Sequence, residues 1–157
     1  MSLWSLVIAC PVAAAMLGLA VMRWRFLVVT VTGTSMTPAL MPGDRVLVRR
    51  RARDGVRVGR IVVFGDPGSE CLAWGYDPAA RKRWMIKRVA AIHGDLVPEV
   101  AQPAVGDITV VPPGMLVVLG DNPASSDSRT WGLLPAGDVL GVAIRRLPPS
   151  GTRRQDM

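Results

Sequence analysis

Twenty consecutive residues without a charge, Leu3 to Met22, lie near the start of the chain and limit what this part of it can become. A helix of that length rises about 1.5 Å per residue and spans the roughly 30 Å hydrocarbon core of a bilayer. Trp4 and Trp24 bracket the segment, as aromatic residues do at membrane interfaces. A cleavable signal peptide is the alternative, but no Lys or Arg precedes the run, which exceeds a typical h-region. We therefore expect a transmembrane anchor over residues 1–22.

The residues that follow predict a single domain of mainly β structure. About 135 residues remain after the apolar segment, which is enough for one hydrophobic core. Short runs of Val, Ile and Leu alternate with turns, in a chain that holds 16 Gly and 13 Pro. We expect a domain over residues 23–147 and a disordered tail over 148–157. The strands are expected at 26–32, 45–49, 61–64, 83–92, 115–119 and 139–147.

Lysine is rare in this chain, and Lys87 is placed unusually. Of the 19 Lys and Arg residues only Lys82 and Lys87 are lysine. Side chains alternate between the two faces of a strand, so Lys87 shares an apolar face with Met85 and Val89. A desolvated lysine can lose its proton, whereas an arginine cannot. Lys87 is therefore a candidate general base; the alternative is a lysine that reaches solvent from a half-buried strand.

Composition argues against metal and cofactor chemistry. His93 is the only histidine, and Cys10 lies inside the apolar segment while Cys71 lies in a predicted loop, so neither a zinc site nor a disulfide framework is indicated. The formal net charge is +7, and five arginines fall within residues 49–57. A solvated loop is the simplest interpretation of that cluster, and contact with anionic lipid headgroups is the alternative. No nucleic-acid motif accompanies the charge, so we expect no nucleic acid, no metal and no cofactor.

Two segments of the chain resemble the serine and lysine boxes of type I signal peptidases. Residues 33–44, Gly-Thr-Ser-Met-Thr-Pro-Ala-Leu-Met-Pro-Gly-Asp, are similar to the serine box. Residues 86–95, which begin Ile-Lys-Arg-Val and end Gly-Asp, are similar to the lysine box. The resemblance implies a mainly β catalytic domain in which Ser35 is the nucleophile and Lys87 the base. It also implies that the Ser35 backbone N–H stabilises the oxyanion, while Gly33 stands where some relatives carry a second donor hydroxyl.

Two further segments complete the resemblance in the same order. Residues 59–64 are similar to a short strand of the family, and residues 120–132, Gly-Asp-Asn through Asp-Ser-Arg to Gly, to its last box. The four segments cover most of the predicted domain. The loop at 97–106 is brief where larger members carry an inserted subdomain. In this respect the chain resembles the small mitochondrial inner-membrane peptidases and the actinobacterial peptidases linked to maturation of nickel-type superoxide dismutase.

The last box is one residue shorter than the family pattern, which leaves two serines as candidates to orient Lys87. Counting back from Asp127 selects Ser125, and counting forward from the first glycine selects Ser126. We favour Ser125, because an ion pair between Asp127 and Arg129 should fix the second half of the loop. The residues expected to brace this loop are Asp121, Asn122, Asp127 and Arg129.

The predicted function is that of a serine endopeptidase which removes signal peptides from exported preproteins, with signal peptides and membrane lipid as its partners. Arg23 and Arg25 follow the apolar segment and would by charge alone place the domain in the cytoplasm. The resemblance implies the opposite side, and we follow it: a single-pass cell-membrane protein with an extracytoplasmic domain. The alternatives are a dedicated peptidase for one or few substrates, such as a metalloenzyme precursor, a self-cleaving serine–lysine regulator, and an inactive anchored adaptor.

Overall fold

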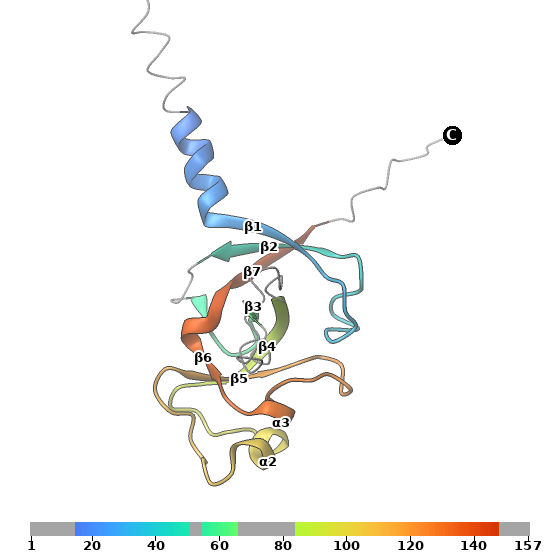
Figure 1. The fold of residues 1–157 in the computed structure, drawn as a ribbon, viewed down its shortest axis with the longest axis vertical. Coiled ribbons are helices and arrows are strands. Elements are labelled where there is room, and N and C mark those ends of the chain that lie inside the picture. Colours follow the sequence, from blue (N-terminus) through green and yellow to red (C-terminus); the bar gives the residue numbers. More distant parts are fainter. Residues whose placement is uncertain (1–14, 51–54, 66–83, 148–157) are drawn as a thin grey trace, which may run out of the picture.

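The computed structural model describes residues 15–50, 55–65 and 84–147. Residues 15–25 form a helix that runs directly into the first strand (Figure 1). Most of the predicted anchor and the whole of the tail at 148–157 lie outside the described residues. Within the described ranges, no helix is both long enough and apolar enough to cross a membrane. The transmembrane helix over residues 1–22 stays a prediction.

Within the part of the chain that the structure describes, seven strands form one antiparallel sheet, which confirms the prediction of a mainly β domain. Along the sheet the order is β1-β2-β7-β3-β4-β5-β6. Figure 1 shows β1 and β2 nearest the helix and β5, α2 and α3 at the opposite end of the domain. The strands are β1 (Phe26–Thr30), β2 (Arg45–Arg50), β3 (Ile61–Gly65), β4 (Trp84–Ile92), β5 (Met115–Leu119), β6 (Leu134–Pro135) and β7 (Val139–Leu147). The short helices are η3 (Glu99–Ala101), α2 (Gln102–Val105), α3 (Ser128–Trp131) and η4 (Ala136–Asp138).

Alternating side chains of β3 contribute to two of the three hydrophobic clusters of the described residues, which lie on opposite faces of the sheet. Val62 and Phe64 contribute to one cluster, and Val63 contributes to the other. The second cluster also holds Met36 and Leu40, both buried, from the loop between β1 and β2. This loop is therefore fixed by apolar packing, in which each buried side chain contributes roughly 1.5–3 kcal/mol.

The same loop is closed by a buried carboxylate. Gly43 has a φ of 91°, which a residue with a Cβ rarely adopts, and so allows the chain to turn into β2. Next to it, the Asp44 side chain accepts a hydrogen bond of 2.7 Å from the Met41 N–H and pairs with Arg146 at 2.8 Å. Asp44 is 5% exposed, so the Pro-Gly-Asp turn is held from within the domain.

Candidate active site

Ser35, the candidate nucleophile, lies directly before the buried Met36 in the β1–β2 loop. Packing of Met36 in the core fixes the backbone at this point, and the Leu40 N–H donates to the Met36 carbonyl at 2.8 Å. A second restraint comes from a distant part of the chain. The backbone N–H of Asn122 donates to the Ser35 carbonyl at 3.1 Å, which joins the Ser35 loop to the loop that follows β5.

Lys87, the candidate base, is buried within β4. Its exposed fraction is only 2%, so the side chain does not reach solvent. Nζ donates to the Ser125 hydroxyl over 2.5 Å. Burial lowers the pKa of Lys87 from its ordinary value, since removal from water disfavours the ammonium form. The negative charge of Asp127 raises the pKa and the positive charge of Arg129 lowers it, and the net direction is downward.

Asp127 organises the loop after β5 as an acceptor of several hydrogen bonds. Its carboxylate, which has no exposed surface, accepts from the Gly120 N–H at 2.7 Å and from the Arg129 N–H at 3.1 Å. The expected ion pair is present, with Arg129 Nε at 2.9 Å and Nη2 at 2.6 Å from the two carboxylate oxygens. Burial alone would raise the pKa of Asp127, but the hydrogen bonds from Arg129 and Gly120 outweigh it and lower the pKa.

Of the two candidate serines in this loop, Ser125 makes the contact with Lys87, while Ser126 is exposed. The arrangement depends on Gly120, to which the sequence analysis assigned no role of its own. A Cβ at Gly120 would lie 2.6 Å from the Ser35 carbonyl oxygen and would also collide with the Ser125 side chain. At Gly120 the Ser125 loop therefore passes so close to the Ser35 loop that there is no room for a side chain. In the sequence, the glycine that opens the Gly-Asp-Asn turn is the feature that could have indicated this close approach.

Asp121 and Asn122 attach this loop to two other parts of the domain. The Asp121 carboxylate pairs with Arg88 in a bidentate contact of 2.7 and 2.8 Å, and Arg88 also donates to the Gly59 carbonyl at 2.8 Å. Asn122 Nδ2 donates to the Thr34 carbonyl at 3.2 Å, directly before Ser35. Asp121 and Asn122 therefore join this loop to β4 and to the Ser35 loop. Arg88 was the partner that sequence reasoning missed, although it follows the candidate lysine immediately.

A cleft of about 170 Å³ lies between the end of β1 and the start of β4. Both candidate catalytic side chains, Ser35 and Lys87, line it together with residues 29–33, Val63 and residues 84–86. At Gly33 a Cβ would meet no atom within 4 Å, so crowding by the protein does not require glycine there. His93 is outside this lining, in the turn after β4. Among the described residues no group of three His, Cys, Asp or Glu side chains could hold a metal ion.

Two strands border this cleft with an edge that no other described strand covers. β1 pairs only with β2 among the described strands. β4 pairs with β3 over residues 84–88, but its pairing with β5 begins only at Arg88. Neighbouring strands from β1 through β2, β7 and β3 to β4 are all antiparallel, so β1 and β4 run in the same direction. Both therefore lead toward the candidate catalytic residues, β1 toward Ser35 and β4 toward Lys87.

Comparison with known proteins identifies the family of this chain. The sequence matches the family described as "Signal peptidase, peptidase S26" over residues 3–102 and 98–147. It is 34% identical over 124 residues to the mitochondrial ATP-independent inner membrane protease subunit 1a of Arabidopsis thaliana, covering 76% of this chain and 68% of the relative. It is also 34% identical over 142 residues to the probable signal peptidase I-1 of a Synechocystis species, covering 74% and 68%.

A solved structure, a signal peptidase I from Enterococcus faecalis, aligns with a TM-score of 0.37 and 22% identity, covering 55% of this chain and 95% of that chain. The extent of the family match and the two relatives decide the class. The chain belongs to the signal peptidase family, peptidase S26, and is a serine protease of the type I signal peptidase kind.

Proposed function

We propose that the protein is a membrane-anchored endopeptidase that removes signal peptides from exported preproteins through a dyad of Ser35 and Lys87. The observation that carries the proposal is the buried position of Lys87 in the cleft that Ser35 also lines. It is 2% exposed, its pKa is lowered by burial, and it lines the same cleft as Ser35. A structural lysine gains nothing from such a position, since burying an unpaired ammonium is costly. A general base requires it, because a neutral amine is the form that accepts a proton.

In the proposed reaction Ser35 Oγ attacks the carbonyl carbon of the scissile peptide bond while Lys87 Nζ takes the hydroxyl proton. The negative charge that forms on the carbonyl oxygen is stabilised by the Ser35 backbone N–H. Lys87 then gives its proton to the nitrogen of the departing chain, which leaves an ester between the substrate and Ser35. A water molecule hydrolyses this ester, with Lys87 again as base, and the Ser35 hydroxyl is restored. Ser125 keeps the amine aimed at Ser35 throughout.

The edges of β1 and β4 that no other described strand covers suggest how a peptide is held. An extended chain lying between them would complete backbone hydrogen bonds on both of its sides, as in other cases of strand addition. Val29, Val63 and Ile86 supply an apolar floor beneath it. Signal peptides suit such a cleft, since their cleavage site consists of small residues that follow an apolar stretch of roughly 7–15 residues. The relatives that carry the name signal peptidase support this substrate class.

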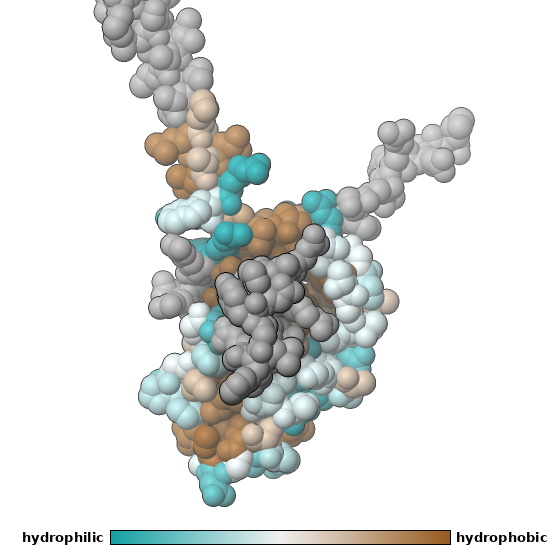
Figure 2. Space-filling view, in the orientation of Figure 1, coloured by the Kyte–Doolittle hydropathy of each residue, from teal (hydrophilic) through white to brown (hydrophobic). Residues whose placement is uncertain are grey.

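Anchoring is proposed from the N-terminal residues. On the described part of the helix the side chains of Met16, Leu17 and Leu19 are 68%, 67% and 60% exposed, and Figure 2 shows hydrophobic colour over this helix. Apolar surface of this kind is costly in water and suits a bilayer. The helix ends at the exposed Arg25, and Arg49 of β2 lies opposite the next residue, Phe26. Positive charge is therefore concentrated at the end of the helix, where lipid headgroups would lie.

The orientation is proposed to be single-pass with the catalytic domain outside the cytoplasm, because signal peptides are cut on that side. Protease treatment of intact cells should then digest the domain. If the domain were protected in intact cells and digested only after lysis, it would lie in the cytoplasm, the side that the positive charges of Arg23 and Arg25 predict.

The experiment that tests the function is processing of a reporter preprotein by the full-length protein in detergent. Wild type should release the mature chain, identified by its new N-terminus, and Ser35→Ala should release at least about 10³-fold less, since single members of a catalytic unit carry most of its effect. Ser126→Ala is the matched control and should process normally. Equal processing by wild type and Ser35→Ala would refute the proposal.

A further inference from the structure

Exposed aliphatic side chains gather on a short ribbon, residues 95–97 and 109–111, beside α2 at the end of the domain opposite the helix (Figure 1). Leu96 and Val110 of this ribbon are 73% and 46% exposed, and Ile108 directly before it is 38% exposed. We call these three residues the distal face. Figure 2 shows hydrophobic colour at this end of the domain. Contiguous apolar patches on a protein surface are often sites of interaction.

The backbone of the ribbon places these side chains next to one another. Leu96 and Val110 form a bridge between two antiparallel segments. The next residues, Val97 and Val111, are buried in the core and donate the flanking hydrogen bonds across the ribbon, each 2.9 Å long. Leu96 and Val110 are therefore a non-hydrogen-bonded pair, in which facing side chains approach most closely. Ile108 shares their face by the two-residue period of extended chain, so the distal face is one continuous patch.

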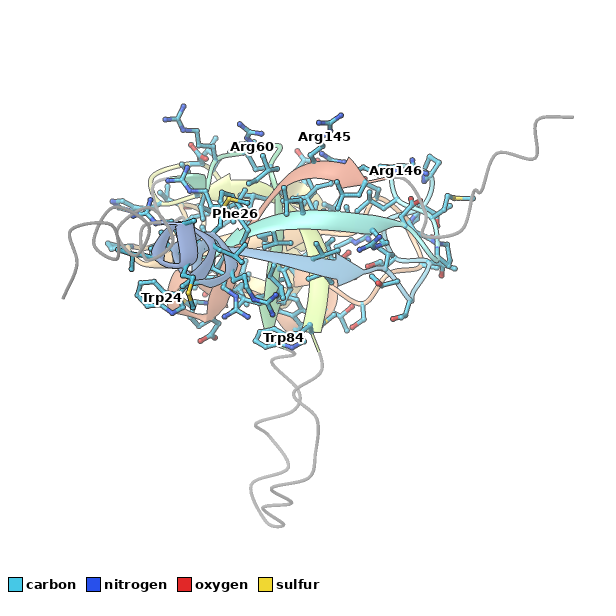
Figure 3. All side chains as sticks on the ribbon, turned by 90° about the horizontal axis from the view of Figure 1, so that it is seen from above. Trp24, Phe26, Arg60, Trp84, Arg145 and Arg146 are labelled. Carbon is cyan, nitrogen blue, oxygen red and sulfur yellow. The ribbon has the colours of Figure 1, made fainter. Side chains whose placement is uncertain are left out.

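Charge also distinguishes the distal face from the rest of the domain. Residues 89–128 contain no Lys or Arg, although the chain has a formal net charge of +7. Three carboxylates in or near the ribbon take part in none of the ion pairs of the described residues: Asp95, Glu99 and Asp107. Positive charge gathers elsewhere, and Figure 3, viewed from the helix side, shows Arg60, Arg145 and Arg146 along one side of the domain. A complementary partner therefore presents aliphatic side chains together with Lys or Arg.

The place of the distal face relative to the helix and the cleft indicates which partner reaches it. If the helix enters the bilayer, the apolar stretch of a signal peptide lies on the helix side, and the chain after the cut leaves on the opposite side. From Lys87 in the cleft, β4 continues to Ile92 before the ribbon, which is about 17 Å along a strand. An extended substrate chain thus reaches the distal face roughly 8–15 residues after the cut. A second copy of the protein fits less well, because it would bring the same carboxylates face to face.

We propose that the distal face binds the mature part of the substrate, at a segment of aliphatic and basic residues roughly 8–15 residues after the cut. The proposal rests on the proposed function and adds a substrate class to it: preproteins whose mature chain carries such a segment. These are processed faster than preproteins with the same signal peptide and a different mature chain. The residues of the distal face lie outside the cleft lining and take no part in bond cleavage.

The test uses the full-length protein in detergent and three reporter preproteins that share one signal peptide and cleavage site. They differ only in a segment about 8–15 residues after the cut, which alternates Leu with Lys, Leu with Glu, or Ser with Lys. Wild type should process the Leu/Lys reporter at least about fivefold faster in kcat/KM than the other two, mainly through KM. The double variant Leu96→Ser, Val110→Ser should reduce this advantage to less than about twofold. The double variant Glu99→Gln, Asp107→Asn should lose the preference for Lys over Glu and keep the preference for Leu over Ser.

Ile144→Ser is the matched control, because Ile144 is 48% exposed in β7 and lies outside both the cleft lining and the ribbon. It should keep the wild-type preferences, and every variant should cut a short peptide that ends before the variable segment at the wild-type rate.

Equal processing of the three reporters by wild type, or unchanged preferences in both double variants, would overturn the distal binding site while leaving the peptidase intact. If Leu96→Ser, Val110→Ser lowered the particle mass in detergent and slowed all reporters alike, the face would be a contact between copies, which would also overturn the proposal. If wild type cuts none of the reporters, or if Ser35→Ala cuts them equally well, the proposed function fails and the distal site with it.

Discussion

The two loops that meet at the candidate active site are held in place by different forces. The Ser35 loop is fixed mainly by apolar packing of Met36 and Leu40. The loop at 120–129 is fixed mainly by hydrogen bonds and charge, with the Asp127 carboxylate at its centre. Packing positions a backbone and tolerates changes of shape, whereas a buried polar network loses much when one member is removed. The loop at 120–129, whose Ser125 holds Lys87, should therefore be more sensitive to substitution than the Ser35 loop.

Outside the proposed dyad itself, the largest effect is expected where the two loops touch. Gly120→Ala would push a methyl group against the Ser35 carbonyl and the Ser125 side chain, and so separate the proposed nucleophile from the group that aims the base. We expect kcat/KM to fall by roughly 10²-fold or more, since a displacement of about 1 Å can cost that much.

Gly137→Ala is the matched control for Gly120→Ala. No atom lies within 4 Å of a Cβ at Gly137, and kcat/KM should stay within about twofold of wild type. Near-normal turnover in Gly120→Ala would mean that the close approach of the two loops has no part in catalysis.

A smaller effect is expected from the hydroxyl that holds Lys87. Ser125→Ala leaves one donor of the amine unpaired, at a cost of about 1–3 kcal/mol. If this cost falls on the transition state, cleavage slows by roughly five- to a hundred-fold. Ser126→Ala should change the rate by less than about twofold, because Ser126 is exposed. A greater loss in Ser126→Ala than in Ser125→Ala would reverse the assignment of the two serines.

The smallest effect is expected on the packed side of the site. Met36→Leu keeps an apolar side chain of similar volume in the core and should lower the free energy of unfolding by less than about 1.5 kcal/mol. The rate of cleavage should change little. A loss of activity equal to that of Ser125→Ala, measured alongside urea denaturation, would show that the Ser35 loop is as sensitive as its partner.

Local sequence patterns predicted the strands well, but they did not predict the contacts between segments that are distant in sequence. Alternation and the Gly and Pro turns predicted a strand at 139–147, and the structure has β7 at Val139–Leu147. For Lys87, alternation along β4 left burial and contact with solvent as alternatives, and in the structure the side chain is buried. The approach of Gly120 to Ser35 and the pairing of Arg88 with Asp121 join segments distant in sequence. The order of strands in the sheet determines such contacts, and no periodicity within one strand encodes that order.

The most direct test of the account is the pH dependence of kcat/KM for a signal peptide substrate. Burial lowers the pKa of Lys87, and the neutral amine is the proposed active form. The rate constant should therefore rise with pH, with a midpoint below 10.5, the ordinary pKa of lysine, and level off above that midpoint. Lys87→Arg should show no such rise, with activity reduced at every pH, because arginine keeps its proton. A flat profile in wild type between mildly acidic and alkaline pH, or substantial turnover by Lys87→Arg, would contradict a neutral lysine base.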